Sequence, residues 1–180
     1  MKLPRGKQNG FSLIELIVAV SLSVMLLLTA SAMFMVFLVS SNQANNARLV
    51  RSEGQYALSQ MEFLLRNAVE LMPLDPANPD TTTCEPNMNS IKFTSIDGGE
   101  TILLKEDDDG HEKIASNSGI YLTSSAVELV EGPTFSCSRQ SFATRPHINI
   151  SFTLKKSGPG VLQNREIIQE FTTSTTIRTL

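Results

Sequence analysis

The sequence lacks an excess of basic residues. Its 15 lysines and arginines are outnumbered by 18 aspartates and glutamates, which gives a formal net charge of −3. A protein that binds nucleic acid needs a cationic surface to neutralise phosphates, so contact with nucleic acid is not predicted. With 180 residues, the chain is long enough for one ordinary domain with an appendage, but too short for two full-sized domains.

Charge is also scarce in one long stretch near the N-terminus. The 29 residues from Phe11 to Val39 contain a single charged side chain, that of Glu15. About 20 apolar residues suffice to cross a hydrocarbon core roughly 30 Å thick, so we interpret residues 11–39 as a transmembrane helix. A cleaved secretory signal peptide is disfavoured, because its apolar region is shorter and ends in a small-residue cleavage site.

Basic residues are concentrated before this stretch. Three of them fall in the first ten positions, namely Lys2, Arg5 and Lys7. The positive-inside rule therefore predicts a cytoplasmic N-terminus and an extracytoplasmic C-terminal region. The protein is expected to be a single-pass membrane protein.

Proline is absent between Pro4 and Pro73, so no helix breaker follows the apolar stretch. Residues 40–72 are predicted to continue the helix in amphipathic form, because small and apolar residues recur at spacings of three and four; these are Val50, Gly54, Ala57, Met61, Leu64, Ala68 and Leu71. Glycine costs roughly 1 kcal/mol relative to alanine in a helix interior. Gly54 therefore predicts either a close packing contact or a bend.

After about residue 89 the apolar pattern changes to a period of two. Ile148, Ile150, Phe152 and Leu154 alternate with polar residues over 147–154, as in a half-buried strand. Shorter strand signals occupy 90–96, 100–106, 119–123, 126–130 and 166–177, and Asp97-Gly98-Gly99 predicts a hairpin turn. Residues 73–180 are therefore predicted to form a mainly antiparallel β domain. The expected fold class is α+β, with a long N-terminal helix packed on a C-terminal antiparallel sheet.

Glu15 is unusual because it lies inside the apolar stretch. A carboxylate at the centre of a membrane costs about 2.5 to 3.5 kcal/mol on insertion scales, and less near the interface, so it normally has a partner. No lysine, arginine or histidine lies nearby except in the first ten residues. A free N-terminal ammonium, created by a cut between Gly10 and Phe11, would be the natural cation.

Residues 7–20, KQNGFSLIELIVAV, resemble the processing signature of type IV pilins and of the pseudopilins of type II secretion systems. The resemblance implies that residues 1–10 are a basic leader and that a prepilin peptidase cuts after Gly10. The same enzyme would N-methylate Phe11, and Glu15 would serve methylation and filament assembly. A type IV pilin-like fold is also implied.

The resemblance further implies partners and a place in the cell. The partners would be the prepilin peptidase/methyltransferase, other pilin or pseudopilin subunits, an inner-membrane assembly platform and membrane lipid. The protein would leave the membrane for a periplasmic or cell-surface filament. Residues 52–68 look like the second helical half of minor pilins and pseudopilins, and residues 21–41 lack the helix-kinking proline of many major pilins. A minor pilin or pseudopilin is therefore the leading hypothesis.

Two other classes of protein remain as alternatives. One is a single-span membrane anchor that presents an extracytoplasmic binding domain, and the other is an exported enzyme. Motifs for nucleophilic hydrolysis, phosphate binding and dinucleotide binding are absent from the sequence. No catalytic residue and no cofactor are predicted, and we expect a non-enzymatic protein.

Cys84 and Cys137 both lie on the predicted extracytoplasmic side, where disulfides persist. A structural disulfide is favoured, with two free thiols as the alternative. The acidic segment 106–112 does not fit a calcium loop, because Lys105 and Ser116 stand where acidic ligands are needed. It is interpreted as a solvated turn between strands, and His111 and His147 lack zinc spacing. No metal site is predicted.

Overall fold

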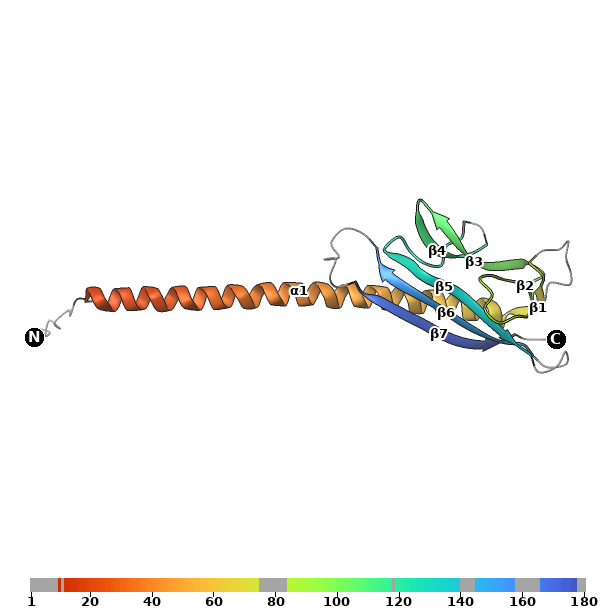
Figure 1. Ribbon diagram of the computed structural model, residues 1–180, viewed down its shortest axis with the longest axis horizontal. Coiled ribbons are helices and arrows are strands. Elements are labelled where there is room, and N and C mark those ends of the chain that lie inside the picture. Colours follow the sequence, from red (N-terminus) through yellow and green to blue (C-terminus); the bar gives the residue numbers. More distant parts are fainter. Residues whose placement is uncertain are drawn as a thin grey trace, which may run out of the picture. The chain divides into compact units, whose positions relative to one another are not determined.

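The structure is a computed structural model that describes residues 10, 12–74, 84–117, 119–139, 145–157 and 166–177. In the described residues a long helix, α1, is followed by strands β1 to β7 (Figure 1). The chain separates into two compact units, Met1–Ala44 and Asn45–Leu180. The expected class, a long N-terminal helix followed by antiparallel strands, is confirmed.

Helix α1, Leu13–Arg66, begins in the first unit. It is long and apolar enough to cross a membrane, and the side chains of residues 12–40 are exposed. The hydroxyl groups of Ser21, Ser23 and Thr29 donate to carbonyl groups three or four residues earlier, at 2.8 to 3.2 Å. These polar side chains are therefore satisfied without water, as a lipid environment requires.

In the second unit α1 buries one face. The buried residues are Val50, Gly54, Ala57, Met61 and Leu65, which confirms the amphipathic pattern, because Leu65 also belongs to the predicted apolar stripe and Leu64 packs against the core while partly buried. At Gly54 a Cβ atom would lie 2.2 Å from the ring of Phe171 on β7. The helix continues through this position. Of the two explanations for this glycine, close packing is confirmed.

The predicted end of the helix is wrong by about six residues. Helix α1 ends at Arg66, and Ala68–Met72 forms strand β1. Both Ala68 and Leu71 are buried, and their spacing of three was interpreted as helical. A register shift between Ala68 and Glu70 explains the error, because a bulge lets two residues at odd spacing face the same side of a strand.

The strands form two antiparallel sheets, where the sequence predicted one. The first has the order β1-β2-β3-β4, with β2 at Ile91–Ser95, β3 at Glu100–Asp108 and β4 at His111–Ser116. The second has the order β5-β6-β7, with strands Val127–Ser138, His147–Lys156 and Ile168–Thr176. The alternation that predicted β6 is confirmed, because all four of its apolar residues are buried.

Three strand predictions need correction. Residues 119–123 form only an isolated bridge between Tyr121 and Ala115. Strand β4 was not predicted, and β5 extends to Ser138 instead of ending at 130. Gly132 and Pro133 are residues that weaken a strand signal, but register shifts between Leu129 and Thr134 accommodate them within β5.

The two sheets share one core with the second half of α1, and Phe93, Phe135 and Phe152 are among its largest fully buried side chains. The predicted disulfide between Cys84 and Cys137 is confirmed, with a Cα–Cα distance of 4.9 Å. The backbone next to Cys84 is also hydrogen-bonded to β5, because the N–H of Cys137 donates to the carbonyl of Glu85 at 2.9 Å. The segment before β2 is thereby fixed to the second sheet.

Candidate functional site

The candidate site is the start of α1, where the sequence predicts leader cleavage. Ser12 is the N-cap, and its carbonyl accepts hydrogen bonds from the N–H groups of Glu15 and Leu16 at 3.1 and 3.2 Å. The hydroxyl of Ser12 accepts a hydrogen bond from the N–H of Glu15 at 3.3 Å. In return the carboxylate of Glu15 accepts one from the N–H of Ser12 at 3.4 Å. This reciprocal pair is a capping box.

The capping box gives Glu15 a local partner that sequence reasoning missed. We expected a carboxylate that awaits a cation, but its described partner is a backbone N–H group of its own helix. The signal was present as the Ser-x-x-Glu spacing of residues 12 and 15, which marks a helix start. A negative charge in the first turn is also favoured by the helix dipole, typically by about 0.3 to 1 kcal/mol.

Gly10 is exposed, and no described heavy atom would lie within 4 Å of a Cβ atom built on it. The fold of the described residues therefore gives no reason for glycine at this position. Phe11, the predicted site of methylation, lies outside the described residues, as do the basic leader residues Lys2, Arg5 and Lys7.

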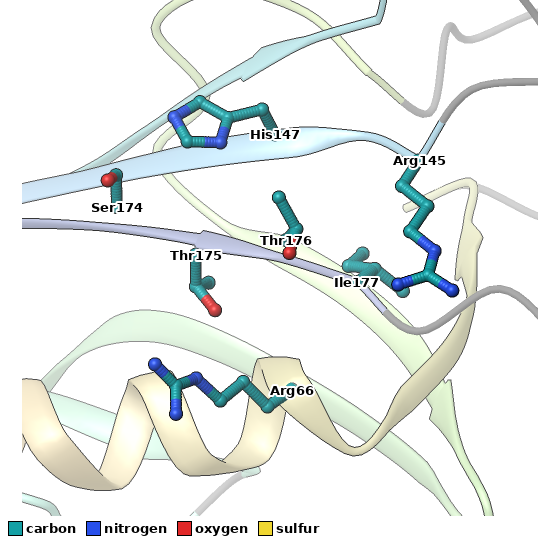
Figure 2. A pocket seen from close by; sticks show the side chains of 7 residues that line it. All are labelled: Arg66, Arg145, His147, Ser174, Thr175, Thr176 and Ile177. Atoms are coloured by element: carbon teal, nitrogen blue, oxygen red, sulfur yellow. The ribbon is translucent and has the colours of Figure 1, made fainter.

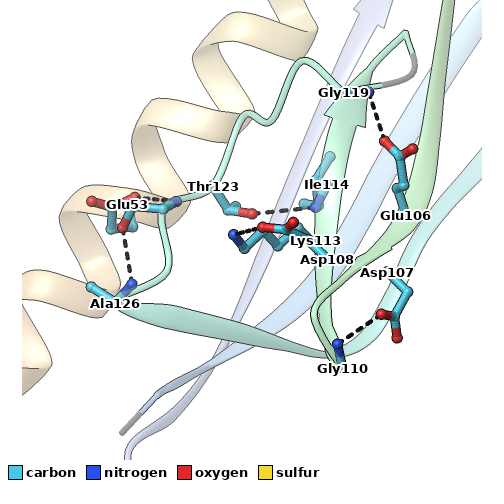
Figure 3. A network of polar contacts seen from close by, with 11 residues as sticks. Glu53, Glu106, Asp107, Asp108, Gly110, Lys113, Ile114, Gly119, Thr123 and Ala126 are labelled. Atoms are coloured by element: carbon cyan, nitrogen blue, oxygen red, sulfur yellow. Dashed lines mark hydrogen bonds and ion pairs between the residues drawn. The ribbon is translucent and has the colours of Figure 1, made fainter.

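The acidic segment 106–112 forms the hairpin between β3 and β4 (Figure 3). Asp109 and Gly110 both have positive φ, 53° and 80°, as the tight turn of a two-residue hairpin requires. The carboxylate of Asp107 accepts the N–H of Gly110 at 2.9 Å, and Lys105 pairs with Glu112 at 2.7 Å. The predicted turn between strands is confirmed. Among the described residues, no group of three or more potential ligands could hold a metal ion.

Lys113 follows this turn and is only 7% exposed. Its ammonium group pairs with Asp108 and lies 4.9 Å from the centre of the Tyr121 ring. Partial burial, together with the carboxylates of Asp108 and Glu106, raises the pKa of Tyr121. Lys113 and Asp108 are therefore paired with each other within the fold, as Lys105 and Glu112 are.

Helix α1 also holds the loop before β5. The carboxylate of Glu53 accepts a hydrogen bond from the N–H of Ser124 at 3.1 Å. The two residues are 71 positions apart in the sequence, and no periodicity in the sequence would have paired them.

Comparison with known proteins locates a family signature at the candidate site. Residues 5–31 match the family model described as the prokaryotic N-terminal methylation motif. No curated protein and no solved structure matches the chain. The matched range contains Gly10, Phe11 and Glu15, together with the apolar beginning of α1. The chain therefore carries, over these residues, the N-terminal methylation motif that is the signature of type IV pilins and pseudopilins.

Proposed function

We propose that this protein is a minor pilin or pseudopilin, a structural subunit that assembles into or primes a type IV pilus or a type II secretion-like filament. In this proposal a prepilin peptidase cuts after Gly10 and methylates Phe11. The observation that carries it is the match of the methylation motif over residues 5–31. The matched segment includes the start of a helix whose apolar side chains are exposed.

The exposed apolar side chains of α1 need an environment that removes them from water. Lipid provides it before assembly, and a bundle of neighbouring helices provides it in a filament. The leader disfavours packing into the helical bundle of a filament, because its three basic side chains are costly to bury among apolar helices. Removal of the leader would thus act as the switch from membrane protein to filament subunit.

Cleavage also creates the cation that Glu15 lacks among the described residues. A methylated amine keeps its positive charge, and attraction to a carboxylate is strong in a medium of low dielectric constant. We propose that the amine of one subunit pairs with Glu15 of its neighbour and so sets the stacking register. The capping box would position this carboxylate at the first turn of the helix.

The proposal of a minor subunit is supported by the continuity of α1. The helix runs from Leu13 to Arg66 without a break, and no proline interrupts residues 21–41. The alternative function is a single-span membrane anchor that presents an extracytoplasmic binding domain. It has the same helix and the same exported region but no need of a cut after Gly10.

Mass spectrometry of the full chain, expressed in cells with an active prepilin peptidase, tests the proposal. We expect a protein that begins at methylated Phe11. A Gly10→Arg variant should keep its leader, because a bulky charged side chain replaces the glycine before the cut. Gly6→Arg is the matched control, since it adds the same charge within the leader and should still be cleaved. Wild-type protein that still begins at Met1 would instead support the membrane anchor.

A further inference from the structure

Three of the four sheet edges in the second unit are short, irregular or covered. Strand β4 is covered by the loop that follows it, because the N–H of Leu122 donates to the carbonyl of Ile114 at 2.7 Å. Strand β5 pairs with the segment around Met88, whose N–H donates to the carbonyl of Phe135 at 2.8 Å, and the rest of β5 contains register shifts. Strand β1 has only five residues and also contains a register shift. Native proteins block unwanted strand pairing in these ways.

Strand β7, in contrast, has a long and regular edge. It borders the second sheet (Figure 1) and pairs with β6 along its nine residues without a register shift. It contains no proline and no lysine. Its one charged residue, Glu170, makes no ion pair within the described residues. The edge of β7 that faces away from β6, called the free edge below, therefore lacks the features that block the other edges.

The hydrogen bonds between β6 and β7 show which backbone groups face the free edge. Just beyond the ladder, the N–H of Ile177 donates to the carbonyl of Pro146, the residue directly opposite, at 3.3 Å. Hydrogen-bonded and non-hydrogen-bonded residue pairs alternate along an antiparallel ladder, so the odd-numbered residues of β7 bond to β6. The even-numbered residues direct their N–H and C=O groups to the free edge, namely Ile168, Glu170, Thr172, Ser174 and Thr176.

The free edge is open to solvent. Its five even-numbered residues are all exposed, and their backbone groups have no hydrogen-bond partner in the part of the chain that the structure describes. Figure 2 shows the side chain of Thr175 directed toward α1 and that of Ser174 on the other face of the strand. Helix α1 therefore packs on one face of β7 and leaves the edge uncovered.

We propose that the free edge of β7 binds an extended segment of another protein by antiparallel strand addition. An extended backbone presents N–H and C=O groups at the spacing of a strand edge, and antiparallel pairing is the more stable arrangement. Side chains of the partner should match their cross-strand neighbours. We therefore expect a lysine or arginine opposite Glu170, and an apolar residue opposite Ile168, which is 53% exposed.

A second copy of this chain is a poorer partner for the free edge. Antiparallel pairing of two β7 strands requires a twofold axis perpendicular to the sheet, and this axis reverses every direction within the plane of the sheet. Helix α1 packs along that plane, with Gly54 against Phe171 of β7, so the two helices would point in opposite directions. Copies inserted into one membrane with the same orientation cannot pair in this way.

The probe for the test is a fluorescent synthetic peptide with the sequence of β6, residues 147–156. It is titrated into the full chain in detergent micelles and followed by fluorescence anisotropy. This sequence already forms a strand beside β7 in the fold. A shift of two residues from the native register would place its Lys155 opposite Glu170. A second peptide carries methyl groups on the backbone nitrogens of Ser151 and Thr153, whose N–H groups would face β7 in this register.

Three variants of the chain separate backbone pairing from side-chain contacts. Thr172→Pro removes one N–H group from the free edge, and edge strands tolerate proline where the N–H faces solvent. Thr172→Val is the matched control, because it keeps this N–H and a β-branched side chain. Glu170→Lys reverses the charge, so it should disfavour the original peptide and favour a peptide with glutamate in place of Lys155.

We expect the unmodified peptide to bind saturably. Thr172→Pro and the N-methylated peptide should each weaken binding about tenfold, because hydrogen bonds to the backbone are lost, whereas Thr172→Val should bind like wild type. The proposal is overturned if the unmodified peptide does not saturate, if N-methylation leaves the affinity unchanged, or if Glu170→Lys does not reverse the preference between the two charged peptides.

Two further measurements complete the test. Near-ultraviolet circular dichroism shows whether Thr172→Pro is folded; a folded variant that binds like wild type overturns the proposal, and if the variant is unfolded, the N-methylated peptide and Glu170→Lys decide. Light scattering of the chain without peptide should show no dimer that depends on the free edge. A dimer that Thr172→Pro abolishes while the fold persists would assign the edge to a second copy and also overturn the proposal.

Discussion

At the scale of single residues, Gly54 shows how one missing side chain holds the helix against a sheet. The ring of Phe171 occupies the space that a Cβ atom of residue 54 would need. That ring is itself stacked on Phe152, with centroids 5.3 Å apart, so it cannot move freely. The contact therefore fixes the distance between α1 and β7.

Gly54→Ala should lower the free energy of unfolding of the second unit by about 1 to 3 kcal/mol, because overpacking a core has this cost. The gain in helix propensity, about 1 kcal/mol, offsets part of the loss. Urea unfolding of the full chain in detergent, followed by near-ultraviolet circular dichroism, measures the change. Ser52→Ala, at an exposed position of the same helix, is the matched control.

A second variant separates packing from any effect of the helix itself. In the Gly54→Ala background, Phe171→Leu shortens the clashing side chain and should recover part of the lost stability. If Gly54→Ala is as stable as Ser52→Ala, the close packing of Phe171 does not limit this position.

Glu15 shows what single residues do and do not reveal in a sequence. The sequence shows that Glu15 lies inside an apolar stretch, and that residues 7–20 around it resemble a known processing signature. The spacing of three between Ser12 and Glu15 indicates that Glu15 caps α1, but this signal is short and lies inside a longer apolar stretch. The contact between Glu53 and Ser124 could not be predicted, because no periodic pattern relates residues 71 positions apart in the sequence.

At the scale of elements, the strongest periodic patterns were also the most reliable. The long apolar helix and the alternating strand β6 were both predicted, because burial on one face imposes a clear period. The sequence pattern of strand β1 predicts a helix, because a bulge between Ala68 and Glu70 breaks the period of two that marks a strand. Strand β4 was missed because its residues Lys113 to Ser116 are all buried and do not alternate.

The disulfide connects two elements of the fold, because it links the segment before β2 to β5 in the other sheet. Replacing both cysteines by serine should lower the free energy of unfolding by about 4 kcal/mol in the loop-entropy model, because the unfolded chain regains its freedom. Urea unfolding with and without a reductant measures this loss. Reductant should destabilise wild type and leave the double variant unchanged. Equal midpoints for wild type under both conditions, with the thiols shown to be free, would contradict the prediction.

At the scale of the whole molecule, the two units place different demands on their surroundings. The second unit buries its own core, whereas the apolar side chains of residues 12–40 are exposed. Such a helix is stable only in lipid or among other helices. Under the proposed function, the first unit therefore determines where the protein resides, and Glu15 determines how subunits meet.

Two variants separate the charge of Glu15 from its capping role. Glu15→Gln removes the charge but keeps an oxygen that can complete the capping box, which accepts glutamine as well as glutamate. Ser12→Ala keeps the charge and removes the cap hydroxyl. Membrane insertion should be intact in both, and slightly improved in Glu15→Gln, because an uncharged side chain costs less in lipid.

The proposed pairing of Glu15 with a neighbour's amine predicts different outcomes for the two variants. Glu15→Gln should abolish most incorporation into filaments, measured by immunoblotting of sheared filaments against the membrane fraction, because an amide cannot neutralise an ammonium group. Ser12→Ala should assemble at a level close to wild type, since loss of an N-cap costs only about 1 kcal/mol of helix stability. Should Ser12→Ala fail while Glu15→Gln assembles, the carboxylate would act by shaping the helix end, and the charge pair between subunits would be excluded.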